Sequence, residues 1–306
     1  MFTQLLSIFI IIASGYGAKK FKVFDQKNAS VFINYALCFA LPALIFDKIY
    51  HVNIDTTLIN VIATGFACSM LGAAAIFLAC RFLKFNKATT VSAVLLGMFG
   101  NTVFMGMPII KGFFGEDAMN EVIFYDQLAT SIPISIFGPF ILAFGAPAKV
   151  SLVQNVMKVI KFPPFVALIL GFLLRGVPLP KVLFDALTLF AQSVVPVALF
   201  AIGIGLGFRS IKSCYKSTAV VIAGKMLLAP FIFILVTIVF GVNFGQIWMI
   251  GILQCAMPPM VLASAMIMKA ELDSQLAVAA VAVGVAFSFV SLPLLSYVFS
   301  CIRCMT

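Results

Sequence analysis

An asparagine and a threonine stand next to each other in the middle of a strongly apolar stretch of the chain. Asn101 and Thr102 precede Pro108 by seven and six residues, and glycines interrupt the same stretch. Proline removes a backbone donor, and glycine lets a chain leave and re-enter a helix. The pattern therefore predicts a broken helix, with Gly100 and Gly106 at the break. The amide, the hydroxyl and the backbone N–H groups freed near Pro108 could together bind a small anion.

A second break is predicted 150 residues further along, where Pro258 repeats the position of Pro108. Gln254 stands four residues before Pro258 and Pro259, so an amide side chain again accompanies a proline. For either segment alone, the alternative is a simple proline kink with glycines for close packing. Two matched breaks favour paired discontinuous helices, which mark the binding sites of many secondary transporters.

Three further polar side chains fall inside apolar stretches. Asp126 and Gln127 are adjacent, and Lys225 lies at a comparable depth in a later stretch. Ionisable groups inside a membrane are costly and usually functional, so these residues are candidates for proton or charge coupling. For Asp126 the alternative is a structural ion pair or an interfacial cap. Lys225 could pair with a carboxylate, attract the anion, or extend its stem to the headgroups.

The elements that must position these residues are membrane helices. The chain of 306 residues is 63% hydrophobic and only 10% charged, with a mean hydropathy of +1.18, whereas soluble domains are about 25% charged. A helix of about 20 apolar residues spans a bilayer. We therefore predict an all-α polytopic membrane protein with ten transmembrane helices and no sizeable soluble domain. The apolar stretches cover residues 3–18, 29–46, 57–80, 88–110, 118–144, 162–174, 182–207, 218–240, 246–268 and 275–299.

The distribution of lysine and arginine predicts the orientation. Fourteen of the twenty lie in loops on one side of the ten-helix arrangement and five on the other, and loops rich in these residues face the cytoplasm. We expect residues 146–161 to be a cytoplasmic linker and both termini to be extracytoplasmic, in a plasma (inner) membrane. The charged pairs Asp47–Lys48 and Glu116–Asp117 lie at helix ends, and their charges are expected to be solvated. The net charge of +10 reports this bias and not nucleic-acid binding.

Several other classes of function lack the residues that they need. The single histidine, His51, excludes paired-histidine metal sites and bis-histidine haem. The seven cysteines lie mostly in apolar stretches, where cysteine behaves as a small hydrophobe. No metal site and no cofactor is predicted, and the coupling ion, a proton or sodium, stays open. A channel and a membrane enzyme are the rival classes, the enzyme disfavoured because no nucleophile–base pair is evident.

The segment GNTVFMGMPIIKGFFG at residues 100–115 resembles the fourth helix of the auxin efflux carrier family, which includes plant auxin exporters and bacterial malonate-type carriers. FALPALIF, CAMPPM and SLPLLSYVF fit helices two, nine and ten of the same family. The resemblance implies two inverted five-helix repeats, residues 1–145 and 162–306, in which the broken helices 4 and 9 cross at Pro108 and Pro258. It implies that Asn101 contacts the substrate. Helices 1, 2, 6 and 7 would form a scaffold, against which helices 3, 4, 5, 8, 9 and 10 slide as an elevator.

Residues and resemblance together predict a secondary transporter of small organic anions, auxin-like or malonate-like carboxylates. Asn101, Thr102 and Gln254 would hold the carboxylate at the crossover. The expected partners are the substrate and the lipid bilayer, with no nucleic acid, and a homodimer through the scaffold helices is left open. A sodium-coupled bile-acid-type symporter is the alternative. The ninth helix has no carboxylate near Pro258, which weakens a sodium site of that type.

Overall fold

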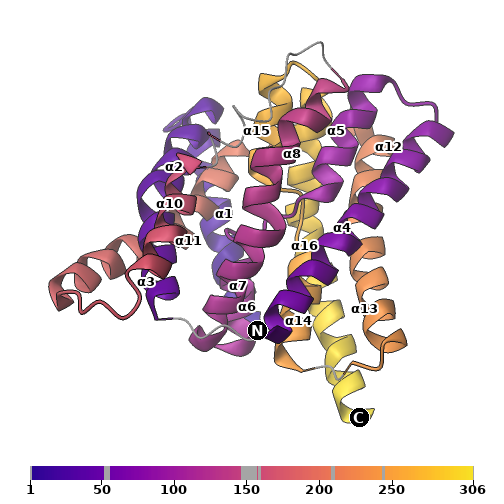
Figure 1. Cartoon of the computed structure of the whole chain (residues 1–306). Helices are drawn as coiled ribbons and strands as arrows, with labels where there is room; N and C mark the ends of the chain where they lie inside the picture. Colours follow the sequence, from indigo (N-terminus) through magenta and orange to yellow (C-terminus); the bar gives the residue numbers. More distant parts are fainter. Residues whose placement is uncertain are drawn as a thin grey trace. The chain divides into compact units, whose positions relative to one another are not determined.

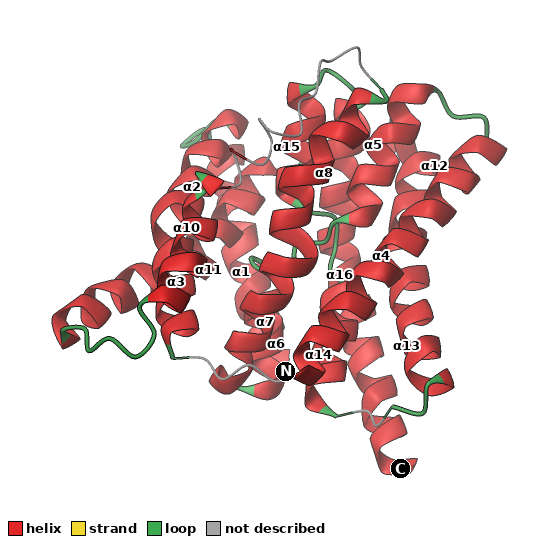
Figure 2. Cartoon of the chain, in the orientation of Figure 1, coloured by secondary structure: helices red, strands yellow, loops and turns green. Residues whose placement is uncertain are grey.

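The computed structural model describes residues 2–51, 56–145, 157, 160–207, 211–242 and 245–305. Within these ranges the regular elements are helices, and the one extended feature is an isolated bridge between two residues (Figure 1, Figure 2). Each predicted apolar stretch coincides with one helix or with consecutive helical segments. In the part described, six helices are long and apolar enough to cross a membrane. The prediction of an all-helical membrane protein is confirmed, and the ten-helix inverted repeat stays a prediction.

The chain folds into two compact units whose segments alternate along the sequence. Unit 1 comprises Met1–Ile54, Val103–Gln127 and Leu152–Leu206. Its helices are α1 (Phe2–Lys20), α2 (Ala29–Tyr35), α3 (Leu41–Tyr50), α6 (Gly106–Phe114), α7 (Met119–Tyr125), α10 (Pro163–Leu173) and α11 (Lys181–Gly205), with short turns η1 (Gln26–Asn28), η2 (Ala36–Ala40) and η3 (Glu116–Ala118).

Unit 2 comprises Asp55–Thr102, Leu128–Ser151 and Gly207–Thr306. Its helices are α4 (Thr56–Phe82), α5 (Lys87–Met98), α8 (Ile132–Ala143), α12 (Ile211–Ile222), α13 (Ala229–Val239), α14 (Gln246–Cys255), α15 (Val261–Lys269) and α16 (Ser274–Met305), with η5 (Ala223–Leu228) between α12 and α13. The turn η4 (Asp126–Ser131) carries the chain from unit 1 into unit 2. Most of the predicted linker 146–161 lies outside the described residues, and the repeat boundaries and the scaffold assignment stay predictions.

In unit 1, α1 and α11 approach each other through glycines. A β-carbon added to Gly15 would lie 2.1 Å from the carbonyl oxygen of Phe200, and one added to Gly203 would lie 2.1 Å from that of Ile12. Such distances admit no side chain, so glycine at both positions lets the two backbones pack directly. The ammonium of Lys19 at the end of α1 donates to the carbonyl oxygen of Leu206, which follows α11.

In unit 2, one isoleucine fills the space between three helical segments. Ile76 of α4 lies against Gly97 of α5 and Gly224 of η5, where added β-carbons would come within 2.1 and 2.3 Å of its side chain. The same buried cluster contains residues of α8, α15 and α16. Asp273 ties this packing to the start of α16: one of its carboxylate oxygens accepts from the N–H of Leu276 at 2.9 Å, and the other accepts from the hydroxyl of Thr89 at 2.6 Å.

Three widened π-helical turns precede prolines: η2, η4 and η5. Pro42, Pro133 and Pro230 are each the second residue of the helix that follows. A proline ring clashes with the carbonyl group four residues earlier and supplies no N–H, and a wider turn relieves both problems. Their apolar sequences predict ordinary α-helix over these segments. The structure instead places Asp126, Gln127 and Lys225 inside π turns.

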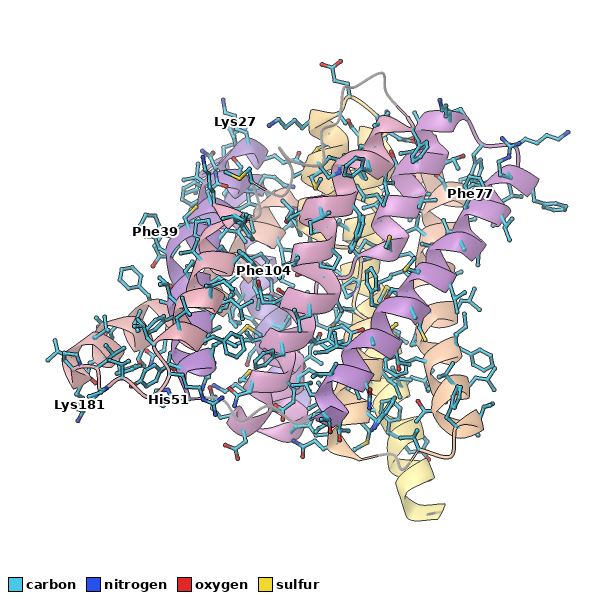
Figure 3. The ribbon with its side chains drawn as sticks, in the orientation of Figure 1. Lys27, Phe39, His51, Phe77, Phe104 and Lys181 are labelled. Atoms are coloured by element: carbon cyan, nitrogen blue, oxygen red, sulfur yellow. The ribbon has the colours of Figure 1, made fainter. Side chains whose placement is uncertain are left out.

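The outer surface of the helices carries many exposed apolar side chains, as a surface in contact with lipid requires. Phe39 of η2 is 60% exposed and Phe77 of α4 is 46% exposed, and both extend away from the ribbon in Figure 3. Lys27 and Lys181 also extend outward, from positions near the ends of helices. Phe104, by contrast, is buried.

Candidate functional site

The two predicted breaks meet inside unit 2. The chain leaves helical conformation after Met98 and, in the other stretch, after Cys255. The N–H of Asn101 donates to the carbonyl oxygen of Pro258 at 2.8 Å, and the N–H of Met260 donates to that of Phe99 at 3.1 Å. Gly100 and Pro259 thereby form an antiparallel bridge. The prolines have no N–H to satisfy, so this short pairing uses the backbone groups that the breaks release.

Two amide side chains beside this bridge are buried, and in the described structure some of their polar atoms have no hydrogen-bond partner. Asn101 is 2% exposed, and its Nδ2 has no partner. Gln254, at the end of α14, is fully buried, and neither its Oε1 nor its Nε2 has a partner. Leaving a buried polar group unsatisfied costs about 1–3 kcal/mol. The neighbouring Thr102 is also buried. The predicted substrate-binding residues are therefore buried in one unit, and two of them have side-chain donors without an internal partner.

Lys225 lies beside the bridge between Gly100 and Pro259. Its side chain is buried, and its Nζ donates to the hydroxyl of Ser69 on α4 at 3.4 Å. A β-carbon added to Gly100 would lie 3.3 Å from this Nζ and 3.2 Å from the carbonyl oxygen of Met257. The ammonium therefore lies against the backbone of the break. Of the roles left open for Lys225, extension to the headgroups is wrong, because the side chain points into the protein.

Ser69 and Cys255 are additions that sequence reasoning missed. The Ser69 hydroxyl lies 3.6 Å from Cys255 Sγ, so it contacts both the ammonium and the thiol. One signal for Ser69 was its place among small residues in the stretch 57–80, which contains Gly65, Cys68 and Gly72. Small residues permit close approach of membrane helices. Indeed, a β-carbon on Gly72 would lie 3.0 Å from the carbonyl oxygen of Gly224 in η5, the turn that carries Lys225.

The remaining predicted residues belong to unit 1. Gly106 begins α6, and Pro108 is its third residue. Asp126 and Gln127 are fully buried at the start of η4. The amide of Gln127 donates to Asp126 Oδ2 at 3.0 Å, while its own Oε1 has no partner in the described structure. The side chains of Asp126 and Gln127 are thus in contact, in a unit other than the one that holds Asn101.

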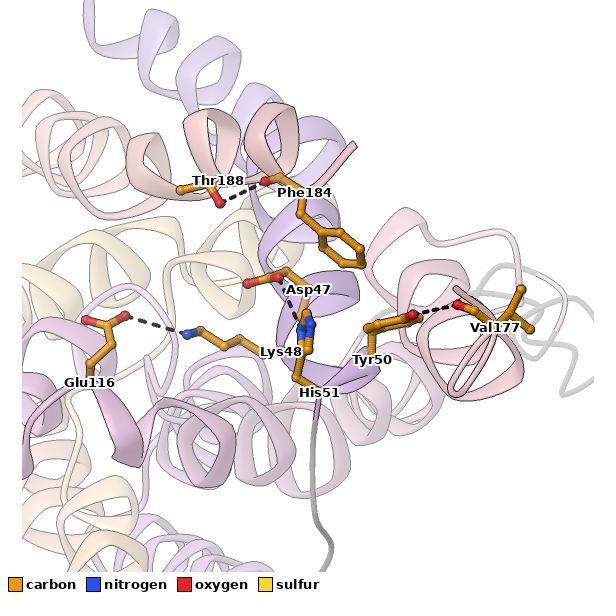
Figure 4. A network of polar contacts seen from close by, with 8 residues as sticks. All are labelled: Asp47, Lys48, Tyr50, His51, Glu116, Val177, Phe184 and Thr188. Atoms are coloured by element: carbon orange, nitrogen blue, oxygen red, sulfur yellow. Dashed lines mark hydrogen bonds and ion pairs between the residues drawn. The ribbon is translucent and has the colours of Figure 1, made fainter. Parts of the chain in front are cut away.

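A second polar region in unit 1 surrounds a cavity of about 650 Å³. Its lining includes Asp47, Lys48, Lys111, Glu116 and Gln192. Glu116 forms an ion pair with Lys111 through one carboxylate oxygen. Its other oxygen lies 3.8 Å from Lys48 Nζ, the pair drawn in Figure 4. The predicted solvation of these helix-end charges is only partly right, because they pair with one another. Charges in this cavity are therefore compensated within the protein.

His51 belongs to the same part of unit 1. Its Nδ1 lies 2.8 Å from the carbonyl oxygen of Asp47 and 3.5 Å from the carboxylate of that residue (Figure 4). The hydroxyl of Tyr50 donates to the carbonyl oxygen of Val177. The Tyr50 hydrogen bond joins the end of α3 to the segment after α10. Throughout the described ranges, no group of three His, Cys, Asp or Glu side chains is placed to hold a metal ion.

Comparison with known proteins identifies the family. A family model described as "Membrane transport protein" matches residues 1–296. The chain belongs to this family. The resemblance to auxin efflux carriers, drawn from the segments around Asn101 and Pro258, is thereby confirmed. The protein is an integral membrane transporter.

Curated relatives also bear transporter names. A protein of Methanothermobacter thermautotrophicus named "Uncharacterized transporter" is 26% identical over 305 residues, which cover 96% of this chain and 97% of the relative. An Escherichia coli K12 protein, also named as an uncharacterized transporter, is 24% identical with 96% of each chain covered. A Rhizobium meliloti protein named "Putative malonate transporter" is 28% identical over 221 residues, covering 68% of this chain and 67% of the relative.

Proposed function

We propose that this transporter carries small organic anions, auxin-like or malonate-like carboxylates, by elevator-type alternating access. The observation that carries the proposal is the pair of buried amides at the bridged breaks. Asn101 and Gln254 offer hydrogen-bonding groups that the described protein does not use, and a carboxylate is a strong acceptor for amide donors. The name of the Rhizobium meliloti relative supports the same substrate class.

The elevator mechanism rests on family membership. Such a mechanism requires a scaffold and a moving body; the proposed scaffold helices all belong to unit 1, which also contains α6 and α7 of the proposed moving body. In this proposal the scaffold is formed by α1, α2 with α3, α10 and α11. The protein lies in the plasma membrane, with both termini extracytoplasmic and residues 146–161 in the cytoplasm, as the bias of lysine and arginine favours.

The first experiment is transport by the purified protein in proteoliposomes. Labelled indole-3-acetate, malonate and other mono- and dicarboxylates are compared for uptake and for counterflow against unlabelled substrate. A carrier gives slow uptake that saturates with substrate concentration, and it shows counterflow. A channel gives fast uptake that does not saturate in this way, and it shows no counterflow. Uptake that requires a sodium gradient would favour the bile-acid-type symporter instead. Absence of transport for every carboxylate would refute the proposed substrate class.

The second experiment tests the site. Asn101→Ala should weaken carboxylate binding roughly tenfold to a hundredfold, because a hydrogen bond to a charged group contributes about 1.5–3 kcal/mol. Asn60→Ala is the matched control, since Asn60 is exposed on α4 of the same unit. Binding is measured by substrate-induced thermal stabilisation of both variants in detergent. Unchanged affinity in well-folded Asn101→Ala protein would mean that the asparagine only packs the break.

A further inference from the structure

The charge of Lys225 is unusual for its surroundings. Among the described residues of unit 2, Lys225 is the only charged side chain that is buried. The ion pairs of the described structure, Lys48–Glu116, His51–Asp47 and Lys111–Glu116, all lie in unit 1. Lys225 therefore has no carboxylate within ion-pair distance in the part of its unit that the structure describes. A buried ion without a counter-charge is strongly unfavourable.

The contacts of the ammonium leave most of its hydrogen-bonding capacity unused. An ammonium has three donors, and the hydrogen bond recorded for Lys225 is a long one, 3.4 Å, to the Ser69 hydroxyl. The thiol of Cys255 contacts Ser69 and lies close enough to the ammonium for the two groups to interact electrostatically. Because Gly100 has no side chain, the ammonium can lie against the bridged backbone. The donors of Lys225 are thus held beside Asn101, the residue next to that glycine.

The groups at the crossover consequently add up to one positive charge and several neutral donors. The neutral donors are the amide NH2 groups of Asn101 and Gln254, whose nitrogens have no partner in the described structure. A carboxylate placed there would neutralise the ammonium. A second carboxylate on the same substrate would find only neutral partners, and a buried charge without a counter-charge is costly.

We infer that Lys225 binds the carboxylate of the substrate, and that the site accepts substrates bearing one net negative charge. These are monocarboxylates, or dicarboxylic acids with one carboxyl group protonated. The inference rests on the proposed function and narrows it. The inference predicts that the site binds singly charged anions more tightly than malonate-like dianions of the same size.

The test compares two ligands and two states of position 225. Malonamate, the half-amide of malonic acid, has almost the size of malonate but one negative charge. In mildly alkaline buffer malonate is fully ionised. There the affinity of the wild-type protein for malonamate should be at least about tenfold higher than its affinity for malonate. Affinities are measured by titration calorimetry on the purified full-length protein. Equal or tighter binding of malonate would overturn the single-charge conclusion.

Lys225→Gln removes the charge. This variant should lose roughly tenfold to a hundredfold in malonamate affinity and, without ligand, should unfold at a higher temperature than wild type, because it no longer buries an unpaired ion. Lys225→Met, which keeps the length of the side chain, provides a second neutral variant should Gln fold poorly. Lys212→Gln is the control, since Lys212 is exposed on α12 of the same unit, and it should change neither property.

The outcomes separate the two proposals. Wild-type affinity for malonamate in Lys225→Gln would overturn the inference and leave the proposed function standing. Loss of thermal stability together with affinity in both neutral variants would make Lys225 a structural residue, which also overturns the inference. If the wild-type protein binds none of the three ligands malonamate, malonate and indole-3-acetate, both the proposed function and the inference fail.

Discussion

Adding a single methyl group at Gly100 tests the geometry of the crossover. In Gly100→Ala the new β-carbon would lie 3.1 Å from Lys225 Cε, 3.2 Å from the carbonyl oxygen of Met257 and 3.3 Å from Lys225 Nζ. The backbone of Gly100 is not in the left-handed region, so alanine can adopt its conformation. The effect of the substitution must then come from the lack of space. The lysine end can move, whereas the Met257 carbonyl belongs to the bridged backbone.

The expected magnitudes differ for stability and for binding. Overpacking costs about 1–3 kcal/mol, and alanine offsets about 0.4–1 kcal/mol of this by restricting the unfolded chain. The free energy of unfolding should therefore fall by about 0–2.6 kcal/mol. Binding should suffer more, because the ammonium has to move away from the break. Loss of one charge-assisted hydrogen bond, about 1.5–3 kcal/mol, corresponds to roughly tenfold to a hundredfold in affinity.

The assay compares Gly100→Ala with Gly17→Ala. Nothing lies within 4 Å of a β-carbon at Gly17 in α1, so the control should be stabilised by about 0.5–1 kcal/mol through its helix propensity and should bind normally. Thermal unfolding and malonamate affinity are measured for both proteins in detergent. Wild-type affinity in Gly100→Ala would refute the placement of the anion beside Lys225 and Gly100.

Three further predictions concern stability, coupling and orientation. Asp273→Ala removes the carboxylate that accepts hydrogen bonds from Leu276 N–H and from the Thr89 hydroxyl. The free energy of unfolding, measured by chemical denaturation, should therefore fall by about 0.5–2 kcal/mol. An unchanged value would contradict the capping role. Asp126→Asn should preserve malonamate binding while flattening the pH dependence of transport, measured as initial rates in proteoliposomes from acid to neutral pH; a wild-type profile would make Asp126 structural. A reporter active only in the cytoplasm should give signal when fused at Lys149 and none at Thr306, and signal at Thr306 would overturn the ten-helix count.

The breaks were predictable because glycine and proline act locally. Proline and glycine disfavour helix whatever surrounds them. The helices indeed end shortly before Gly100 and shortly before Pro258 and Pro259. The start of α10 at Pro163 follows from the same reasoning, since proline suits the first turn of a helix. Local chemistry of this kind can be read from a single segment.

The pairing of the breaks and the direction of Lys225 could not be read in this way. The bridge between Gly100 and Pro259 joins segments far apart in the chain, and no local pattern states which segments meet. A long lysine stem can turn outward or inward. Its inward direction here depends on Ser69 of α4 and on the closely packed Gly72. The π turns were missed because a period of 3.6 residues was assumed through Pro133 and Pro230.

The two hydrogen bonds between the breaks have a mechanical consequence. Separating Asn101 N–H from the Pro258 carbonyl, and Met260 N–H from the Phe99 carbonyl, would leave four buried backbone groups without these hydrogen bonds. Each such group costs several kcal/mol where no water can replace the partner. Thermal motion will therefore bend the surrounding helices before it parts this joint. The backbone segments that carry Asn101 and Pro258 therefore stay joined, and in the elevator movement proposed above they would travel as one piece.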